Sequence, residues 1–547
     1  MSTIAPAVEQ VKHRNIGEIW SVAKARHLVD HILAGCRRNP EAPLILMEDG
    51  PSLSRPEFLA QLAQFGGYLK QHVRPGDRVG LALGNRIEFF IALFAAIACR
   101  AVVVAINPDS KDHDAGYVLQ DAQPSVLIVQ PDNRALFERL AKDLPRPPHI
   151  VALGSDPEPH GFAHLGSQAA SLDLDKVDCR PEDVTCVFYT SGTTGAPKGC
   201  MVDHLWWLRI VDVDLRLNPE GRERALCCVP FFYADPAIYL MELLQIGGTL
   251  VSMRRFSVSR YWDVVHRFGI TKLHTIASIP VLLVKAPPHP HERDHRVHHA
   301  TCVAVPANHH RELVERFGFP WIDNYGATET GQICRMPWHM RDEMIGSGSL
   351  GVPSPEVELR VVDDEGRDVG VGEAGESLVR APHMFSGYFN RPDATAESLR
   401  DGWYHTGDLV KRDERGFVYF LGRKKDIIRR SGQNVAAAEV EAVLRLIPQV
   451  KDAAVIPVPD EIRGEEVKAY LLLVDGNTPA DLPPEEVVRF CVERLAGFKV
   501  PRYIEYRSGD FPRTPSMRVQ KQELKTEKAN LTEGAWDRDK EMGRVRA

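Results

Sequence analysis

The chain has 547 residues, and its 67 basic and 74 acidic side chains give a formal net charge of −7. Hydrophobic residues make up 44% and charged residues 26%, and the 41 glycines and 39 prolines exclude collagen-like and low-complexity classes. A mildly acidic chain gives no reason to expect a nucleic-acid partner.

The first part of the chain alternates helical and strand-like patterns. Apolar residues recur at helical spacing over 55–73 and 88–99. Short apolar runs of strand length occupy 78–83, 101–106, 125–129, 183–189, 272–278 and 321–325. Strands that are apolar throughout and alternate with helices are typical of parallel sheets covered on both faces. We therefore expect an α/β fold in this region.

The pattern changes after about residue 350. Short strands separated by Gly- and Asp-rich turns predict a small antiparallel sheet or barrel, and they occupy 357–363, 376–381 and 417–422. A small α+β unit is predicted beyond Gly422, with helices at 438–447 and 485–496 and strands at 452–458 and 467–474. The charged stretch after Leu524 is expected to fray.

The cysteines and the apolar segments bear on localisation. None of the ten cysteines forms a Cys-x-x-Cys pair, so a zinc ribbon or thioredoxin-like site has no support. The N-terminus lacks the features of a signal peptide. The most apolar stretch, 89–106, contains Arg100 and is too interrupted to span a bilayer. We expect a cytoplasmic protein with reduced thiols and no membrane contact.

The segment YTSGTTGAPKG at 189–199 follows a predicted strand and carries the strongest chemical signal. Its glycines free the backbone to surround a phosphate with N–H donors, and Lys198 adds a mobile positive charge. The segment is not a Walker A loop, because Lys198 is followed by Gly199. Taken alone, it is also compatible with a Ser/Gly-rich surface loop. The residues expected to surround the phosphate are Thr190, Ser191, Gly192, Thr193, Thr194 and Gly195.

This segment resembles the signature loop of the adenylate-forming superfamily, which contains acyl-CoA synthetases, nonribosomal adenylation domains and luciferases. The resemblance continues in the right order through NYGATETGQ (324–332), WYHTGDL (403–409), GRKKDIIRRSGQNV (422–435), LAGFKVPRYIE (495–505) and PRTPSMRVQKQEL (512–524). It implies ATP-dependent activation of a carboxylic acid as an acyl-adenylate, followed by displacement of AMP by a thiol, usually CoA.

The resemblance also implies a domain organisation. A large N-terminal AMP-binding region, 1–424, would contain two α/β sheet subdomains and a small β subdomain. A small α+β C-terminal domain, 425–547, would rotate between the two half-reactions about a hinge at Lys425. Residues Ser431, Gly432 and Gln433 match the loop that lines the pantetheine tunnel, where a side chain at Gly432 would block the path.

Further site residues follow from the same resemblance. Lys198, Thr328, Glu329 and Arg518 match catalytic positions, with Glu329 as the Mg²⁺ ligand. The remaining nucleotide contacts would come from Asn324, Tyr325, Gly326, Asp408 and Arg423. Tyr325 offers a flat face for adenine, although a core tyrosine is the alternative. Asp408 would accept hydrogen bonds from the ribose hydroxyls, although by themselves Asp408 and Arg423 resemble a solvated turn pair.

The acyl pocket is less clearly marked. Its expected lining residues are Tyr233, Ala234, Ala237, Trp207 and Ala277. The small residues among them would admit a bulky acid, but packing is an equal alternative. The identity of the acid does not follow. Five histidines crowd the Pro-flanked segment 287–300, which we interpret as a solvated loop, because metal ligands need convergent geometry.

Two departures from the superfamily pattern stand out. Most members carry a Gly-Ala-Pro-like turn whose backbone approaches the nucleotide, whereas this chain has Val305 before Pro306. The usual C-terminal motif ends in Ser-Gly-Lys, and its lysine bridges the carboxylate and the α-phosphate during adenylation. The aligned residue here is Arg518, and arginine is not a conservative replacement at such a position.

We therefore hypothesise that the thioesterification half-reaction is intact and that adenylation is weak or absent. The acyl-adenylate would then come from a separate adenylating enzyme. The alternatives are a complete ATP-dependent acyl-CoA synthetase, in which Arg518 or Lys521 replaces the lysine, a stand-alone enzyme that loads a carrier protein, and a non-catalytic descendant. The expected ligands are a carboxylic acid or its adenylate, ATP, CoA, and Mg²⁺ if the ATP step operates. A homodimer is left open.

Overall fold

The structure is a computed structural model, and it describes residues 25–154, 162, 169–190, 197–217, 223–276, 278–431, 433–513 and 519–542. The chain divides into two compact units. The larger unit comprises most of the chain up to residue 359 together with 379–404, and the smaller unit comprises most of 360–378 and of the chain from 405 onward.

The first sheet of the larger unit has the strand order β6-β5-β3-β4-β7-β8. Its strands are β3 (Arg78–Ala82), β4 (Val102–Ala105), β5 (Val126–Val129), β6 (His149–Ala152), β7 (Val184–Thr190) and β8 (Lys198–Asp203). All neighbours are parallel except β7 and β8, which form an antiparallel pair. The parallel sheet predicted from the apolar runs is confirmed.

A second sheet of the larger unit runs in the order β2-β1-β10-β9-β11-β12-β13-β14-β15. Its strands are β1 (Pro43–Met47), β2 (Ser52–Ser54), β9 (Arg224–Cys227), β10 (Thr249–Ser252), β11 (Lys272–Ile276), β12 (His299–Val303), β13 (Trp321–Ala327), β14 (Gly331–Arg335) and β15 (Ser349–Pro353). From β1 to β13 the neighbours are parallel, and β13, β14 and β15 are antiparallel. The switch to antiparallel pairing creates the hairpin that carries the NYGATETGQ motif.

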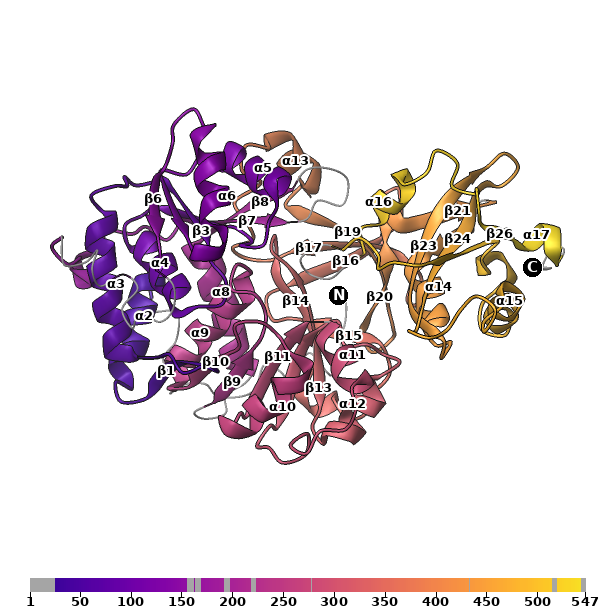
Figure 1. The fold of residues 1–547 in the computed structure, drawn as a ribbon, viewed down its shortest axis with the longest axis horizontal. Coiled ribbons are helices and arrows are strands. Elements are labelled where there is room, and N and C mark those ends of the chain that lie inside the picture. The colour runs from indigo at the N-terminus through magenta and orange to yellow at the C-terminus, as the bar shows by residue number, and fades with distance from the viewer. Residues whose placement is uncertain are drawn as a thin grey trace. The chain divides into compact units, whose positions relative to one another are not determined.

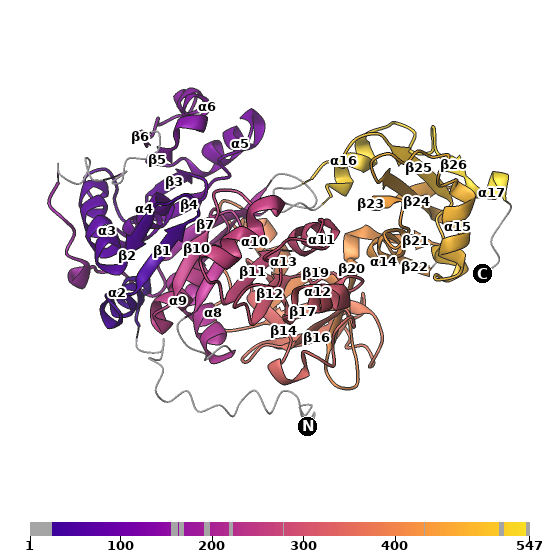
Figure 2. The same ribbon diagram turned by 60° about the horizontal axis from the view of Figure 1, so that its bottom comes forward.

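Helices fill the space between the two sheets and cover their outer faces (Figures 1 and 2). The inner helices are α2 (Leu28–Arg38), α3 (Arg55–Leu69), α4 (Ile87–Ala98), α8 (His204–Leu217) and α9 (Ala234–Ile246). The outer helices are α5 (Asp112–Ala122), α6 (Pro131–Lys142), α10 (Val258–Arg267), α11 (Ser278–Lys285) and α12 (His310–Phe317). Neighbouring residues of β4 show the layering, because Val103 packs into the inner cluster and Val104 into an outer one.

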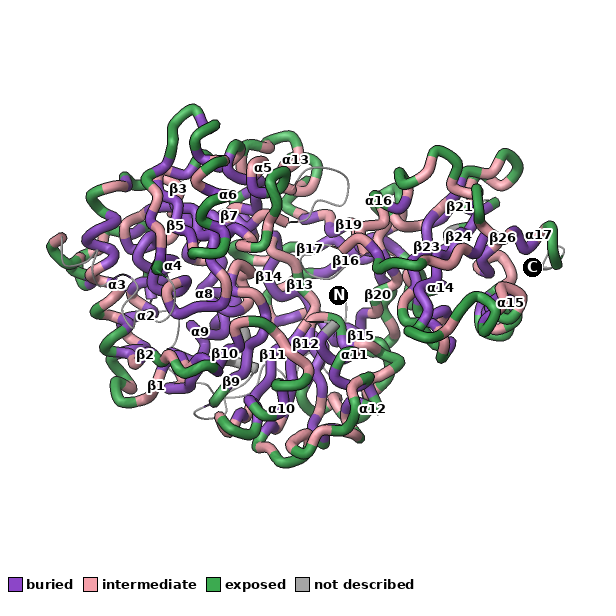
Figure 3. The backbone as a smooth tube through the Cα atoms, viewed as in Figure 1, coloured by how far each residue is buried: buried purple, intermediate pink, exposed green. Residues whose placement is uncertain are grey.

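Helix α4 explains the most apolar stretch of the sequence. Every residue of this helix except Glu88 is buried, because it lies between two sheets and is covered on all sides. Figure 3 shows the same contrast between buried strands and partly exposed outer helices. None of the described helices has the length and apolarity needed to cross a membrane.

The smaller unit contains most of a short β sheet and a separate α+β sheet. The first has the order β16-β17-β19-β20, with β16 (Glu358–Val362), β17 (Gly375–Arg380), β19 (Trp403–Arg412) and β20 (Val418–Arg423). The second contains β21 (Ile427–Arg430), β22 (Gln433–Ala436), β23 (Val450–Asp460), β24 (Gly464–Leu473), β25 (Tyr503–Arg507) and β26 (Trp536–Asp537). Helices α14 (Ala437–Leu444) and α15 (Pro484–Val492) pack into its core. The predicted fold class is confirmed, and the boundary at Lys425 stays a prediction.

The sequence predicted fraying after Leu524. Up to residue 542, where the structure describes it, this charged stretch instead forms β26, α17 (Arg538–Glu541) and the end of α16 (Lys521–Thr526). Trp536 and Asp537 form β26 against β25, and the side chain of Arg538 is almost completely buried. Its guanidinium donates to the carbonyl oxygen of Val500 at 2.9 Å and pairs with Asp539 at 2.8 Å. A buried arginine with satisfied donors fixes the segment, which charge content alone did not indicate.

Candidate active site

The ends of the predicted phosphate loop lie on an antiparallel strand pair. Thr190 is the last residue of β7 and pairs with Lys198, the first residue of β8. The Thr190 hydroxyl donates to the Lys198 carbonyl oxygen at 3.3 Å. The predicted nucleotide contacts Ser191, Gly192, Thr193, Thr194 and Gly195 lie outside the described residues. The described geometry thus fixes where the loop leaves and re-enters the sheet.

Lys198 lies beside a tyrosine that connects it to Glu329. The Lys198 amine is 5.1 Å from the centre of the Tyr388 ring, a cation–π distance. The Tyr388 hydroxyl donates to Glu329 Oε1 at 2.7 Å, and the Tyr404 hydroxyl lies 3.4 Å from that of Tyr388. Burial, together with the Glu329 carboxylate, raises the pKa of both tyrosines. Both therefore stay protonated and able to donate at neutral pH.

Sequence reasoning missed this tyrosine pair. Tyr404 falls inside the WYHTGDL motif without having been assigned a role, and Tyr388 lies outside all six motifs. Tyr388 is 59 positions from Glu329 in the chain, so no local pattern connects them. An aromatic hydroxyl that reaches a buried carboxylate becomes visible only in the folded chain.

The β13–β14 hairpin carries the predicted adenine and metal residues. Asn324 Oδ1 accepts a hydrogen bond from Gln332 Nε2 at 2.8 Å, across the hairpin. Tyr325 is half-buried, and Thr328 lies in the turn just before the buried Glu329. Gly326 must be a glycine in this geometry, because a Cβ there would come within 2.5 Å of the Gly331 carbonyl oxygen. The hairpin thus brings the predicted residues of this motif together.

The turn at Val305, which differs from the superfamily pattern, is held by the buried carboxylate of Asp323. Ala304 adopts a left-handed conformation with φ of 67°, which is unusual for a residue with a side chain. The Val305 amide donates to Asp323 Oδ2 at 2.9 Å. Burial raises the pKa of Asp323 to about 7, and the hydrogen bonds from the turn oppose the rise. Asp323 is the last residue before the predicted nucleotide contact Asn324.

Asp408 and Arg423 form a pair in the smaller unit. They are directly opposite residues of β19 and β20, and Arg423 Nε lies 2.7 Å from Asp408 Oδ1. Asp408 is only 4% exposed, whereas the Arg423 side chain is 32% exposed. Arg423 also donates a hydrogen bond to the carbonyl oxygen of Thr406 at 3.1 Å, and the Thr406 hydroxyl accepts one from the Asp408 amide. The pair is therefore more ordered than a solvated turn pair.

The predicted hinge residue Lys425 and the predicted tunnel residues Ser431 and Gln433 are exposed. Lys425 lies in the short helical turn Lys424–Asp426, and partial dehydration with nearby cations lowers its pKa to about 8. Water screens that effect, because the residue is exposed. Ser431 has a left-handed φ of 52°, and Gln433 begins β22. Gly432 lies outside the described residues.

Four of the five predicted acyl-pocket residues lie on α8 and at the start of α9. Tyr233 is half-buried at the N-cap of α9, directly before Ala234, and Ala237 is buried one turn later. Trp207 is almost completely buried, and its indole N–H donates to the Thr185 hydroxyl at 2.9 Å. This contact gives Trp207 a packing role. Ala277 lies outside the described residues, so a pocket formed by all five residues stays a prediction.

Residues 512, 513 and 519–524 of the C-terminal motif are described, and Arg518 lies outside the described residues. The nearest described cation in the motif is Lys521, the first residue of α16 (Lys521–Thr526). Its amine pairs with Glu441 Oε1 at 2.7 Å, and the side chains of both residues are mostly buried. This lysine is therefore already engaged within the smaller unit.

Matches to known proteins extend over most of the chain. A family model described as "AMP-binding enzyme" matches residues 33–389, and one described as "AMP-binding enzyme C-terminal domain" matches residues 439–518. A crotonobetaine/carnitine–CoA ligase of Salmonella arizonae is 31% identical over 468 residues, covering 83% of this chain and 89% of that protein.

Solved structures agree with these matches. ATP-bound MatB from Rhodopseudomonas palustris has a TM-score of 0.81 at 25% identity, covering 91% of this chain and 98% of that one. The o-succinylbenzoate CoA synthetase MenE from Bacillus subtilis, in complex with its acyl-adenylate intermediate, has a TM-score of 0.79 at 26% identity, with 90% and 97% covered.

Proposed function

The chain belongs to the AMP-binding enzyme family, and we propose that it forms an acyl-CoA thioester from a carboxylic acid by way of an acyl-adenylate. The observation that carries the proposal is the likeness over 83% of the chain to a crotonobetaine/carnitine–CoA ligase, with both family models matched in order. The phosphate-loop strands, the Glu329 hairpin and the Asp408–Arg423 pair support the nucleotide part of the reaction.

The proposed roles follow the charges of the side chains. Lys198 would neutralise charge on the phosphates, because it supplies a cation at the end of the loop. Asp408, an ionised acceptor, would bind the ribose hydroxyls, and Arg423 would orient it. Tyr325 would stack on the adenine.

Glu329 fits the Mg²⁺ ion that the family implies. Its carboxylate is buried, and Tyr388 holds one of its oxygens. Within the described part of the chain, no lysine or arginine forms an ion pair with this carboxylate, so a divalent cation would balance its charge. Carboxylate oxygen is the ligand type that Mg²⁺ prefers, and the ion would neutralise phosphate charge when bound.

We further propose that the adenylation half-reaction is weak, because Arg518 replaces the usual lysine. The pairing of Lys521 with Glu441 supports this view, since that lysine would have to leave a mostly buried partner to substitute. The acyl-adenylate would then reach the protein from a separate adenylating enzyme. A complete two-step synthetase and a carrier-protein loading enzyme are the alternatives.

The deciding experiment separates the two half-reactions. The wild type and Arg518→Lys are assayed for pyrophosphate release from ATP with a panel of acids, beginning with crotonobetaine and carnitine, the substrates named for the similar ligases. Thioester formation from synthetic acyl-adenylates is measured in parallel by mass spectrometry, with CoA and with a phosphopantetheinylated carrier protein. We expect CoA thioesters from the adenylates and stronger pyrophosphate release in the lysine variant.

A different result would refute each part of the proposal. Robust pyrophosphate release by the wild type, unimproved by the lysine, would refute the adenylation defect and leave a complete synthetase. Transfer to the carrier protein but not to CoA would refute the choice of thiol. No product from any adenylate, with adenylate binding intact, would favour a non-catalytic protein.

A further inference from the structure

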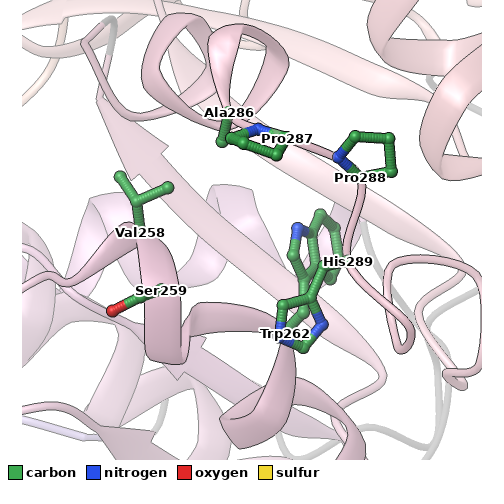
Figure 4. Close-up of a pocket in the computed structure, with 7 residues that line it drawn as sticks. All are labelled: Val258, Ser259, Trp262, Ala286, Pro287, Pro288 and His289. Atoms are coloured by element: carbon green, nitrogen blue, oxygen red, sulfur yellow. The ribbon is translucent and has the colours of Figure 1, made fainter.

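The histidine-rich segment 287–300 lies against α10 and α12, on an outer face of the larger unit. Its beginning forms one wall of a surface pocket of about 450 Å³, where Pro287, Pro288 and His289 face Val258 and Trp262 of α10 (Figure 4). His291 and Asp294 follow directly after this wall, and His266 lies in the last turn of α10. The fold therefore brings together side chains that are far apart in the sequence.

The segment is fixed on both sides rather than loosely solvated. Glu292 forms an ion pair with Arg316 of α12 at 2.8 Å, and both side chains are mostly buried. Arg293 Nη2 donates to the Glu315 carbonyl oxygen at 2.7 Å, and the His295 ring makes a 3.0 Å hydrogen bond to the Phe317 carbonyl oxygen. These contacts hold the backbone that carries His291 and Asp294 against α12.

Three potential ligand atoms converge between these anchors. His266, His291 and Asp294 each offer one atom, and the three atoms lie within 4.8 Å of one another. Asp294 Oδ2 is 3.2 Å from His266 Nδ1 and 3.7 Å from His291 Nδ1. Ligand atoms of a tetrahedral zinc ion, each about 2.0–2.2 Å from the metal, are about 3.3–3.6 Å apart. Both distances from Asp294 are close to that spacing.

A second carboxylate favours the tautomer of His291 that binds metal. Asp263 Oδ1 lies 3.9 Å from His291 Nε2, on the opposite side of the ring from Asp294. A proton on Nε2 faces this carboxylate and leaves the lone pair on Nδ1. In the described structure His291 Nδ1 is buried and makes no hydrogen bond. A carboxylate behind a metal-binding histidine is the usual supporting arrangement.

We propose that His266, His291 and Asp294 form a binding site for a divalent transition-metal ion of the zinc class, with Asp263 as the supporting carboxylate. Two imidazoles and one carboxylate suit Zn²⁺ or Co²⁺ rather than Mg²⁺, which prefers oxygen ligands. The site is separate from Glu329, so it does not depend on the proposed function.

A hydrogen bond within the cluster would compete with metal binding. His266 Nδ1 is 2.8 Å from the Asp294 carbonyl oxygen, so the ion must displace that hydrogen bond or take the carbonyl oxygen as a fourth ligand. The side chains of His266 and Asp294 are 43% and 70% exposed, which leaves room for a water ligand. A bound ion would tie the end of α10 to the segment that α12 anchors.

The test uses the full-length chain without a histidine tag, free of nucleotide and stripped of metal by a chelator. Zn²⁺ is titrated against a chromophoric chelator, and Co²⁺ is added separately to record the absorption bands of a tetrahedral site. The variants are His291→Gln, Asp294→Asn and Asp263→Asn. His309→Gln is the matched control, because its ring contacts Glu312 outside the cluster. Thermal unfolding without metal checks that each variant folds.

We expect one site in the wild type and in His309→Gln, with Zn²⁺ raising the unfolding temperature of both. Loss of a direct ligand in His291→Gln or Asp294→Asn should remove the cobalt bands and weaken Zn²⁺ binding about 100-fold or more, and Asp263→Asn should weaken it about 10- to 100-fold. Equal affinity in the wild type and Asp294→Asn would overturn the proposal, and so would the absence of a tetrahedral cobalt spectrum in the wild type. Asp294→Asn keeps the test valid if His291→Gln does not fold, because the Asp294 side chain is largely exposed.

Discussion

Replacement of Asp408 by asparagine tests the nucleotide site with little change of shape. The Asp408 side chain is 6% exposed, and its Oδ1 lies 2.7 Å from Nε of Arg423, the residue paired with it across the hairpin. Asparagine fills the same volume but is neutral. The substitution therefore removes the ionised acceptor that we expect to bind the ribose hydroxyls, while the packing of β19 against β20 is kept.

The magnitude follows from the kind of bond that is lost. A hydrogen bond to a charged group contributes about 1.5–3 kcal/mol, which corresponds to about 10- to 150-fold in affinity. The cost in stability is smaller, because the Arg423 side chain is 32% exposed and water can solvate it when its partner is neutral. We expect that cost to stay at or below about 1 kcal/mol.

The assay compares Asp408→Asn with Asp413→Asn, a change in the same hairpin. Asp413 accepts hydrogen bonds from the amides of Arg415 and Phe417 and from the Tyr419 hydroxyl, so its loss weakens the turn without touching the pair. Calorimetric titration with a non-hydrolysable acyl-adenylate analogue should show weaker binding in Asp408→Asn alone. Equal losses in both variants, or none in Asp408→Asn, would refute the ribose assignment.

Three further predictions concern other parts of the site. Gly432→Leu should spare adenylate binding but slow CoA-thioester formation about tenfold or more, because overfilling a packed passage costs about 1–3 kcal/mol. An unchanged rate of thioester formation would contradict the tunnel assignment. In the Arg518→Lys background, where stronger pyrophosphate release is expected, Glu329→Gln should lower Mg²⁺-dependent pyrophosphate release about 100-fold and have a smaller effect on thioester formation from supplied adenylate. Equal effects on both rates would count against a role confined to the ATP step. Because burial raises the pKa of Asp323 to about 7, the folded state keeps a proton that the unfolded chain loses above about pH 4. Stability should therefore fall as the pH rises toward 7, and urea unfolding from pH 5 to 8 should show a shallower fall in Asp323→Asn; identical slopes would contradict this.

The periodic patterns predicted most of the fold because they report burial directly. The helical repeat over 88–99 became α4 (Ile87–Ala98), and the apolar run 125–129 became β5. The prediction that the C-terminal tail frays was wrong, because its charged sequence does not reveal its buried contacts. Only the pairing of β26 with β25 and the buried contacts of Arg538 show why the tail is ordered.

Sequence reasoning identified site residues well where one short segment carries several of them. The β13–β14 hairpin holds Asn324, Tyr325 and Glu329 within a single motif, so the spacing of that motif alone placed them together. The same reasoning missed Tyr388, because the contact with Glu329 joins two segments that no pattern connects. Thr406, which accepts from the Asp408 amide, lay inside a motif but had no distinctive chemistry of its own.

The histidine segment shows why residue spacing cannot decide a metal site that two elements share. Within 287–300 the histidines alone give no convergent set, which made a solvated loop the better interpretation of the sequence. The decisive partner, His266, belongs to α10, and it offers a ligand atom within 4.8 Å of those of His291 and Asp294. That proximity depends in turn on Glu292 and Arg293, whose contacts with α12 hold the segment in place. Convergence is therefore a property of the anchors as much as of the ligands, and anchors of this kind leave no repeat in the sequence.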